Sequence, residues 1–75
     1  MVLSMPDYRI TVKCTKLNRG QRIDKGMEVY VHTNQFANPI IADKEAVAYA
    51  FKMRGVDIVA LGALNTSCLD AKRID

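Results

Sequence analysis

The stretch Tyr8-Arg9-Ile10-Thr11-Val12-Lys13-Cys14 decides the fold, because its side chains alternate strictly between two kinds. Apolar side chains fall at every second position, and charged or hydroxyl side chains lie between them. A period of two with this β-branched content is typical of a strand that buries one face. We therefore predict a half-buried strand over residues 8–14.

A second alternating stretch, residues 27–32, predicts the partner of this strand. One face is apolar, and the other carries Glu28, Tyr30 and His32. We expect the two strands to pair antiparallel. The outward face of the resulting sheet would then be polar and need no cover.

The connection between the two strands contains two turn signals. Asn18-Arg19-Gly20 is turn chemistry because Asn and Gly tolerate a positive φ, and Ile23 followed by Asp24-Lys25-Gly26 indicates a short extended piece and a second turn. The connection is longer than a tight hairpin needs, so we expect Leu17 and Ile23 to pack beneath it.

An amphipathic helix is predicted from Asp43 to Arg54. Asp43 can accept hydrogen bonds from the first-turn amides, and Gly55 suits the left-handed position after a helix. Asp57 is expected to cap a further short apolar turn that ends at Gly62. The apolar stripe of the helix follows three- and four-residue spacing and consists of Ala46, Val47, Ala50, Phe51 and Met53.

Extended segments are also predicted on both sides of this helix. Residues 34–38 are a predicted loop, and Pro39-Ile40-Ile41 is expected to form a short edge strand, where Pro is tolerated. Residues 68–74 alternate weakly as a last strand, with Leu69 and Ala71 inward, and we expect this strand to pair with the first. The predicted core comprises Ile10, Val12, Leu17, Val29, Val31, Val47, Ala50, Phe51, Leu61, Leu64 and Leu69.

The predicted fold class is therefore α+β. It has an N-terminal antiparallel β-hairpin, one main amphipathic helix packed on the sheet, a short apolar helical turn, and a C-terminal strand that pairs with the first strand. The 75 residues are 49% hydrophobic and 25% charged, as in globular proteins. We expect a single small α+β domain over residues 1–75, with residues 1–6 as a loose N-terminal extension.

The sequence also bears on the location of the protein. Residues 1–6 lack the length and the basic start of a secretory signal. No stretch approaches the roughly 18 apolar residues of a membrane span. We therefore expect a cytoplasmic protein without a membrane partner.

Positive charge is concentrated in residues 9–25, which we call the basic segment. This segment holds six basic side chains and one acidic side chain, whereas the rest of the chain holds five basic and seven acidic ones. The net charge of +3 therefore arises from the basic segment. Its cations are the candidate electrostatic contact surface: Arg9, Lys13, Lys16, Arg19, Arg22 and Lys25.

Two interpretations of the basic segment remain open. Six phosphate contacts would give a strongly salt-dependent affinity for nucleic acid, but the nearby aromatic rings, Tyr8 and Tyr30, do not make a stacking ladder. Alternatively, the cations form a solvated strand face and loop, where lysines also protect an edge strand. A helix-turn-helix is disfavoured, because the apolar turn after Asp57 carries no Lys or Arg to contact a major groove.

The chain holds few of the side chains that catalysis requires. His32 is the single histidine, and Glu28 on the same strand face is about 13 Å away, too far to orient it. A catalytic His32 would need a pocket around it, and Ser67 or Cys68 could act as nucleophile only close to His32. The glycines form no phosphate-binding loop. We therefore expect no enzymatic activity, no cofactor and no small-molecule substrate.

Cys14 and Cys68 are the two cysteines of the chain, and they do not form the dense pattern of a disulfide scaffold. We favour reduced, packed thiols, and a single disulfide between the terminal strands is the alternative. Two cysteines and His32 are too few ligands for a zinc site, so we expect no metal.

Several stretches together resemble a known family. They are residues 8–14, Lys16-Leu17-Asn18-Arg19-Gly20, Lys25-Gly26-Met27, Asn38-Pro39-Ile40 and Gly62-Ala63-Leu64-Asn65-Thr66. On these residues the chain, from Met5 onward, resembles a family of short uncharacterised proteins from Bacteroides-type gut bacteria, a domain of unknown function. The resemblance implies no activity, cofactor or site, and Val2-Leu3-Ser4 ahead of Met5 departs from its pattern.

Two functional hypotheses follow from these observations. The first is a small non-catalytic interaction module that binds a protein partner or itself, with an edge strand as one route to a homodimer. The second is an accessory nucleic-acid-binding protein that uses the basic β-hairpin 9–25.

Overall fold

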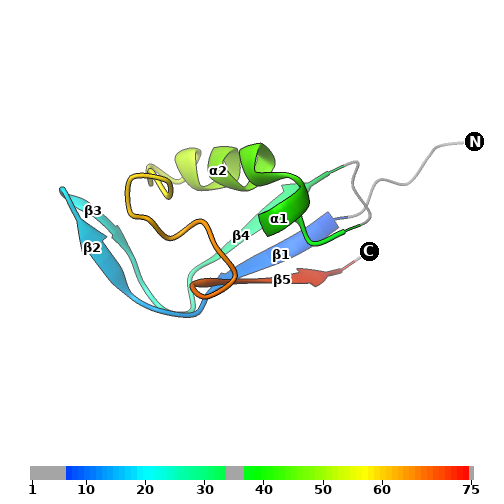
Figure 1. Ribbon diagram of the computed structural model, residues 1–75, viewed down its shortest axis with the longest axis horizontal. Coiled ribbons are helices and arrows are strands. Elements are labelled where there is room, and N and C mark those ends of the chain that lie inside the picture. Colours follow the sequence, from blue (N-terminus) through cyan, green and yellow to red (C-terminus); the bar gives the residue numbers. More distant parts are fainter. Residues whose placement is uncertain (1–6, 34–36, 75) are drawn as a thin grey trace, which may run out of the picture.

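The computed structural model describes residues 7–33 and 37–74. The predicted N-terminal extension, residues 1–6, lies outside the described residues, as do residues 34–36 of the predicted loop. The predicted α+β class is confirmed (Figure 1). In chain order the elements are β1 (Asp7–Val12), β2 (Lys16–Asn18), β3 (Gln21–Ile23), β4 (Glu28–His32), α1 (Pro39–Ala42), α2 (Lys44–Lys52) and β5 (Leu69–Arg73).

The main sheet is antiparallel, in the strand order β4-β1-β5. Ile10 at its centre lies opposite Val29 of β4 and Ala71 of β5. The predicted pairings of the first strand with the second and with the last are therefore both confirmed. Strict alternation in β1 places Tyr8, Ile10 and Val12 in the core, with at most 7% of each side chain exposed.

Helix α2 packs over this sheet (Figure 1) and supplies Phe51, the largest of the fully buried side chains among the described residues. Asp43 caps the helix as predicted, because its Oδ1 accepts a hydrogen bond from the Ala46 N–H at 3.4 Å. Its Oδ2 accepts a second one from the Thr33 hydroxyl at 2.7 Å, which ties the helix start to the end of β4. Gly55, at φ 79°, ends the helix in the predicted left-handed conformation.

The predicted apolar turn after α2 is also present. The Asp57 carboxylate accepts a hydrogen bond from the Ala60 N–H at 3.1 Å, and Gly62 ends the turn at φ 68°. Ile58 and Leu61 from this turn enter the core, with at most 5% of either side chain exposed. Hydrogen bonds from the Lys16 ammonium to the Gly62 carbonyl and from the Asn18 side-chain amide to the Ala60 carbonyl join this turn to β2.

The segment between β1 and β4 differs from the prediction, because it forms a separate two-stranded sheet, β2–β3. Asn18 ends β2 opposite Gln21, and the two residues between them adopt positive φ, 50° at Arg19 and 79° at Gly20. A two-residue hairpin loop needs this geometry to match the twist of its strands. The predicted positive φ at Gly20 is therefore confirmed, whereas the other one falls on Arg19 and not on Asn18.

Two other predictions about packing were wrong. Leu17 is 69% exposed, because the alternation of β2 turns it away from the core, whereas Ile23 is fully buried as expected. Met53 is 68% exposed and belongs to the rim of α2. Ala50 and Leu64 are half-buried beside the core. Core members that the sequence did not predict include Ile40, Val56, Ile58 and Ala63.

The predicted edge strand at Pro39-Ile40-Ile41 is instead the short helix α1. The Asn38 side chain accepts a hydrogen bond from the Ile40 N–H at 2.9 Å, and Pro39 occupies the first turn, where its missing N–H costs nothing. Burial of Ile40 at 1% exposure fixes this turn against the core.

Candidate functional site

The six cations of the basic segment lie in two regions, the main sheet and the segment that contains the β2–β3 hairpin. Arg9 lies on β1 in the main sheet, with its Nε 3.7 Å from a Glu28 carboxylate oxygen. Register places Arg9 between Tyr30 and Lys72 on the outer sheet face. The other five follow the end of β1 or belong to the β2–β3 hairpin and the turn after it: Lys13, Lys16, Arg19, Arg22 and Lys25.

Two of the hairpin cations have intramolecular partners. Arg22 donates to Asp24 Oδ1 at 2.9 Å, and this hydrogen bond together with the charge of Asp24 raises the pKa of the Arg22 guanidinium. The Lys16 ammonium donates to the Gly62 carbonyl at 3.4 Å. The Lys16 contact ties the hairpin to the end of the turn after α2, and the Arg22–Asp24 pair reduces the charge that the segment presents to a partner.

His32 has a carboxylate partner that the sequence reasoning missed. Its Nδ1 lies 2.5 Å from the Asp7 carboxylate, because Asp7 stands directly opposite His32 in the β1–β4 register. Both side chains are about half exposed. The signal was present in the sequence, since pairing the two alternating stretches in this register places Asp7 beside His32.

The outer edge of β4 presents unpaired backbone groups. The Val12 N–H donates to the Met27 carbonyl at 2.8 Å, and bonded and non-bonded pairs alternate along an antiparallel ladder. The backbone N–H and C=O of Val29 and Val31 therefore point toward β1. Those of Glu28, Tyr30 and His32 point away from the sheet, where no strand of the described chain pairs with them.

A groove of about 450 Å³, which we call the β4 groove, lies between this edge and α2. On the strand side it is lined by residues 29–32, so His32 does lie in a concave site. On the helix side it is lined by four residues at helical positions i, i+3, i+4 and i+7, followed by Arg54. We call this set the α2 stripe: Ala46, Tyr49, Ala50 and Met53.

The rim of the β4 groove carries large apolar side chains in solvent. Tyr30 is 58% exposed, Tyr49 63% and Met53 68%. Only some of these were predictable, because the sequence assigned Met53 to the inward stripe and gave Tyr49 no role. Their positions depend on the rotation of α2, which places Val47 and Phe51 in the core and leaves the α2 stripe facing the groove.

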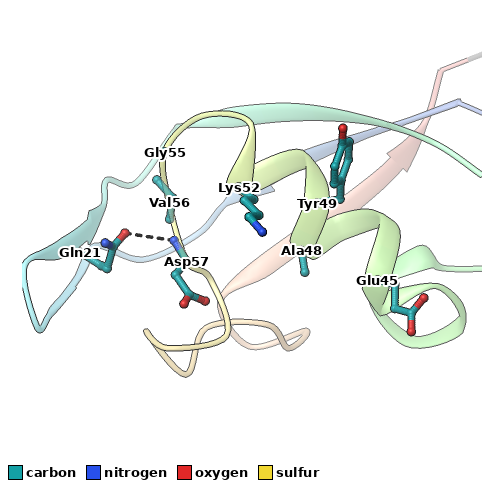
Figure 2. Close-up of a pocket in the computed structure, with 8 residues that line it drawn as sticks. All are labelled: Gln21, Glu45, Ala48, Tyr49, Lys52, Gly55, Val56 and Asp57. Carbon is teal, nitrogen blue, oxygen red and sulfur yellow. Dashed lines mark hydrogen bonds between the residues drawn. The ribbon is translucent and has the colours of Figure 1, made fainter.

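A second groove of about 590 Å³ lies on another side of α2. Figure 2 shows Gln21 of β3 reaching toward Asp57, whose N–H donates to the Gln21 side-chain oxygen at 3.0 Å. Glu45 and Lys52 project from α2 two turns apart (Figure 2). These polar groups do not converge on one point, and the Gln21 hydrogen bond has a structural explanation because it ties the hairpin to the turn after α2.

The two cysteines are free thiols that lie close together. Cys68 is buried and Cys14 is half-buried. A hydrogen bond between the thiols, followed by burial and the charge of Cys68, raises the pKa of the Cys14 thiol. Lys16 and Lys13 act in the opposite direction. Among the described residues, no group of three or more His, Cys, Asp or Glu side chains is placed to hold a metal ion.

The lining of the β4 groove limits its chemistry. His32 and Asp7 supply a base with a carboxylate that can orient it. The described residues that line the groove include no Ser, Thr or Cys to act as nucleophile. Within residues 7–33 and 37–74, no helix has the length and apolar character needed to cross a membrane.

Comparison with known proteins places the chain in a family. No curated protein and no solved structure matches it. A family model described as a family of unknown function (DUF6140) matches residues 5–71. That range covers β1 through Ala71 in β5, and therefore nearly the whole sheet, both helices and the β4 groove. The protein belongs to this family of unknown function, DUF6140.

Proposed function

We propose that this protein is a small non-catalytic interaction module that binds a protein partner, or itself, by adding a strand to the outer edge of β4. The observation that carries the proposal is the edge at Glu28, Tyr30 and His32, with which no described strand pairs, beside the α2 stripe, whose Tyr49 and Met53 are exposed. An added strand would gain main-chain hydrogen bonds from the edge and side-chain contacts from the groove.

The edge of β4 supports this role because it is poorly protected against pairing. Natural edge strands are usually blocked by lysines, prolines, bulges or a covering element. Residues 28–32 contain no Lys or Pro, and their burial alternates regularly, as in an uninterrupted strand. By contrast, β5 at the other edge carries Asp70, Lys72 and Arg73. The two edges are therefore not equivalent, and β4 is the better acceptor of a strand.

A library of extended peptides, displayed on phage and selected against the intact chain, tests the proposal. Selected peptides are then titrated into ¹⁵N-labelled protein. We expect amide shifts at Glu28–His32 and along α2, and weaker binding by Tyr30→Lys, which places a charge on the edge. Leu17→Lys is the matched control, because Leu17 is similarly exposed but lies on β2. Shifts that map elsewhere, or equal binding by both variants, would contradict the proposal.

The alternative function, contact with nucleic acid through the basic hairpin 9–25, has weaker support. Arg9 and Arg22 pair with carboxylates, so fewer than six cations remain for phosphates. Fluorescence titration with duplex and single-stranded oligonucleotides at two salt concentrations tests this alternative. Binding that falls steeply with salt and is lost in Arg19→Glu/Arg22→Glu would support it. Absence of binding at low salt would exclude it.

We place this module in a bacterial cytoplasm. The support is the resemblance to proteins of Bacteroides-type gut bacteria, together with two free thiols, which persist in reducing compartments. Fractionation of cells that express the intact chain tests this placement. We expect the protein in the cytosolic fraction, with both thiols open to alkylation after unfolding. Recovery of the protein outside the cytosolic fraction would contradict this placement.

A further inference from the structure

We infer that the occupant of the β4 edge is a second copy of this chain, paired antiparallel about a two-fold axis at Tyr30. The inference rests on the proposed function and names its partner. In this dimer β4 lies beside β4 of the other copy, and the two three-stranded sheets become one continuous sheet.

The outward-pointing backbone groups of β4 are spaced correctly for this pairing. Glu28, Tyr30 and His32 are the residues whose N–H and C=O groups point outward, and they are centred on Tyr30. In an antiparallel pair about Tyr30, each outward residue meets another outward residue of the second copy, so the ladder can form without slippage. Tyr30 meets Tyr30, and Glu28 meets His32 on both sides of the axis.

Charge and side-chain chemistry favour the same register. The Glu28 carboxylate can accept a hydrogen bond from an N–H of the facing His32 imidazole, and the two Tyr30 rings form an aromatic cross-strand pair. A shift by two residues would place Glu28 opposite Tyr30 and would carry one end of the ladder beyond β4. The symmetric register therefore uses all three outward residues and matches their chemistry.

The α2 stripe is self-complementary in the same arrangement. A two-fold axis through an antiparallel strand pair stands perpendicular to the sheet, so both α2 helices lie on the same face and run antiparallel. In each helix, small and large side chains alternate along the stripe in the order Ala46, Tyr49, Ala50, Met53. Small residues allow the helices to approach, and the exposed side chains of one can enter the groove of the other. The apolar rim, 63% and 68% exposed at Tyr49 and Met53, is covered as a result.

The size of this interface sets the expected strength. One edge strand of five residues and the four residues of the α2 stripe are far fewer than the roughly 20–30 residues per partner of a standard interface. We therefore expect a dimer with a dissociation constant on the order of micromolar rather than nanomolar. The chain should be monomeric when dilute and dimeric when concentrated.

Sedimentation velocity of the intact chain from about 1 μM to about 500 μM tests the inference. The wild type should follow a reversible monomer–dimer curve. Tyr30→Lys should weaken dimerisation at least tenfold, because the two ammonium groups meet on the axis. Leu17→Lys adds the same charge at a similarly exposed site away from β4 and should match the wild type. Circular dichroism melting confirms that both variants fold.

A charge exchange tests the register. His32→Glu places two carboxylates opposite each other twice and should weaken the dimer about three- to tenfold. Glu28→Lys added to it restores opposite charges and should recover most of the loss. Both variants lose intrachain pairs with Asp7 or Arg9, and thermal melting monitors that effect separately. If dimerisation of the double variant is no stronger than that of His32→Glu, the register about Tyr30 is wrong.

The outcomes separate this inference from the proposed function. A chain that stays monomeric at about 500 μM but binds selected peptides at β4 overturns the dimer and leaves strand addition intact. A dimer equally sensitive to Leu17→Lys and Tyr30→Lys overturns the β4 interface. A monomer that also binds no peptide at β4 overturns both proposals.

Discussion

The main sheet and the β2–β3 hairpin are both antiparallel, but they are held in place differently. In the main sheet, alternate side chains of β1 and β4 are buried against α2. These side chains include Tyr8 of β1 and Val31 of β4. The hairpin contributes one fully buried side chain, Ile23, and exposes Leu17. Polar contacts also hold the hairpin in place, such as the 3.0 Å hydrogen bond from the Asp57 N–H to the Gln21 side-chain oxygen. Packing therefore defines the main sheet, whereas turn geometry and a few tethers define the hairpin.

The largest expected effect tests this difference directly. Ile10→Ala removes a fully buried side chain at the centre of the main sheet and should lower the free energy of unfolding by about 2–5 kcal/mol. Leu17→Ala makes the same change on the hairpin, where the side chain is exposed, and should stay within about 0.5 kcal/mol of the wild type. Urea titration followed by circular dichroism measures both.

If Ile10→Ala does not fold, the milder Ile10→Val should still cost about 0.5–1.5 kcal/mol. Equal losses for Leu17→Ala and the Ile10 variant would mean that the hairpin is packed as firmly as the sheet. That result would remove the distinction between the two regions.

The same distinction explains which parts of the fold the sequence predicts. The period of two in β1 and β4 reflects burial of one face, so these strands and their pairing are readable. The hairpin strands have three residues each, too few to show a period. For Pro39-Ile40-Ile41, an apolar run beginning with Pro suits an edge strand or a first helical turn equally. The Asn38 cap was the available signal for helix α1.

The candidate site divides in a similar way. Alternation correctly predicts that Glu28, Tyr30 and His32 share the outer face of the sheet. The groove beside them was not predictable, because it depends on how α2 is rotated and on which side of the sheet remains an edge. Tyr49 illustrates the limit. Its spacing fits an apolar stripe, but the choice between core and rim is made by the packing of Phe51.

A smaller effect of opposite sign is expected at the hairpin turn. Arg19 is held at φ 50°, a conformation that Asn adopts at lower cost, and Asn-Gly is the preferred pair for this loop. Arg19→Asn should therefore raise stability by about 0.5–1 kcal/mol and the melting temperature by about 2–8 °C.

Lys25→Asn is the control for Arg19→Asn, since it removes a similar charge from an exposed turn position that does not have a positive φ. It should leave the melting temperature nearly unchanged. An equal gain in both variants would point to reduced charge repulsion within the basic segment instead of relief of the strained turn.

The smallest expected effect lies where the chain leaves the main sheet for the hairpin. Cys14 follows β1 at this junction, and its hydrogen bond with the Cys68 thiol raises its pKa. Because the thiolate is the reactive form, the pH midpoint for alkylation of Cys14 by iodoacetamide should lie above that of the same residue in the urea-unfolded chain. Cys68→Ala removes the main cause and should move the midpoint down, while Lys16 and Lys13 continue to favour the thiolate.

Mass spectrometry of the alkylated peptides measures the extent of alkylation at Cys14 separately from that at Cys68. The midpoint is the informative quantity, because restricted access of the reagent slows alkylation at every pH, whereas the thiol contact and burial raise the pKa of Cys14 and so move the midpoint. A midpoint that is the same in the folded wild type and in Cys68→Ala would mean that the two thiols are not in contact in solution. The end of β1 would then be joined to the start of β5 by backbone pairing, such as the 2.7 Å hydrogen bond from the Lys13 N–H to the Cys68 carbonyl, without a thiol contact. The hairpin would be tethered through its polar contacts and Ile23.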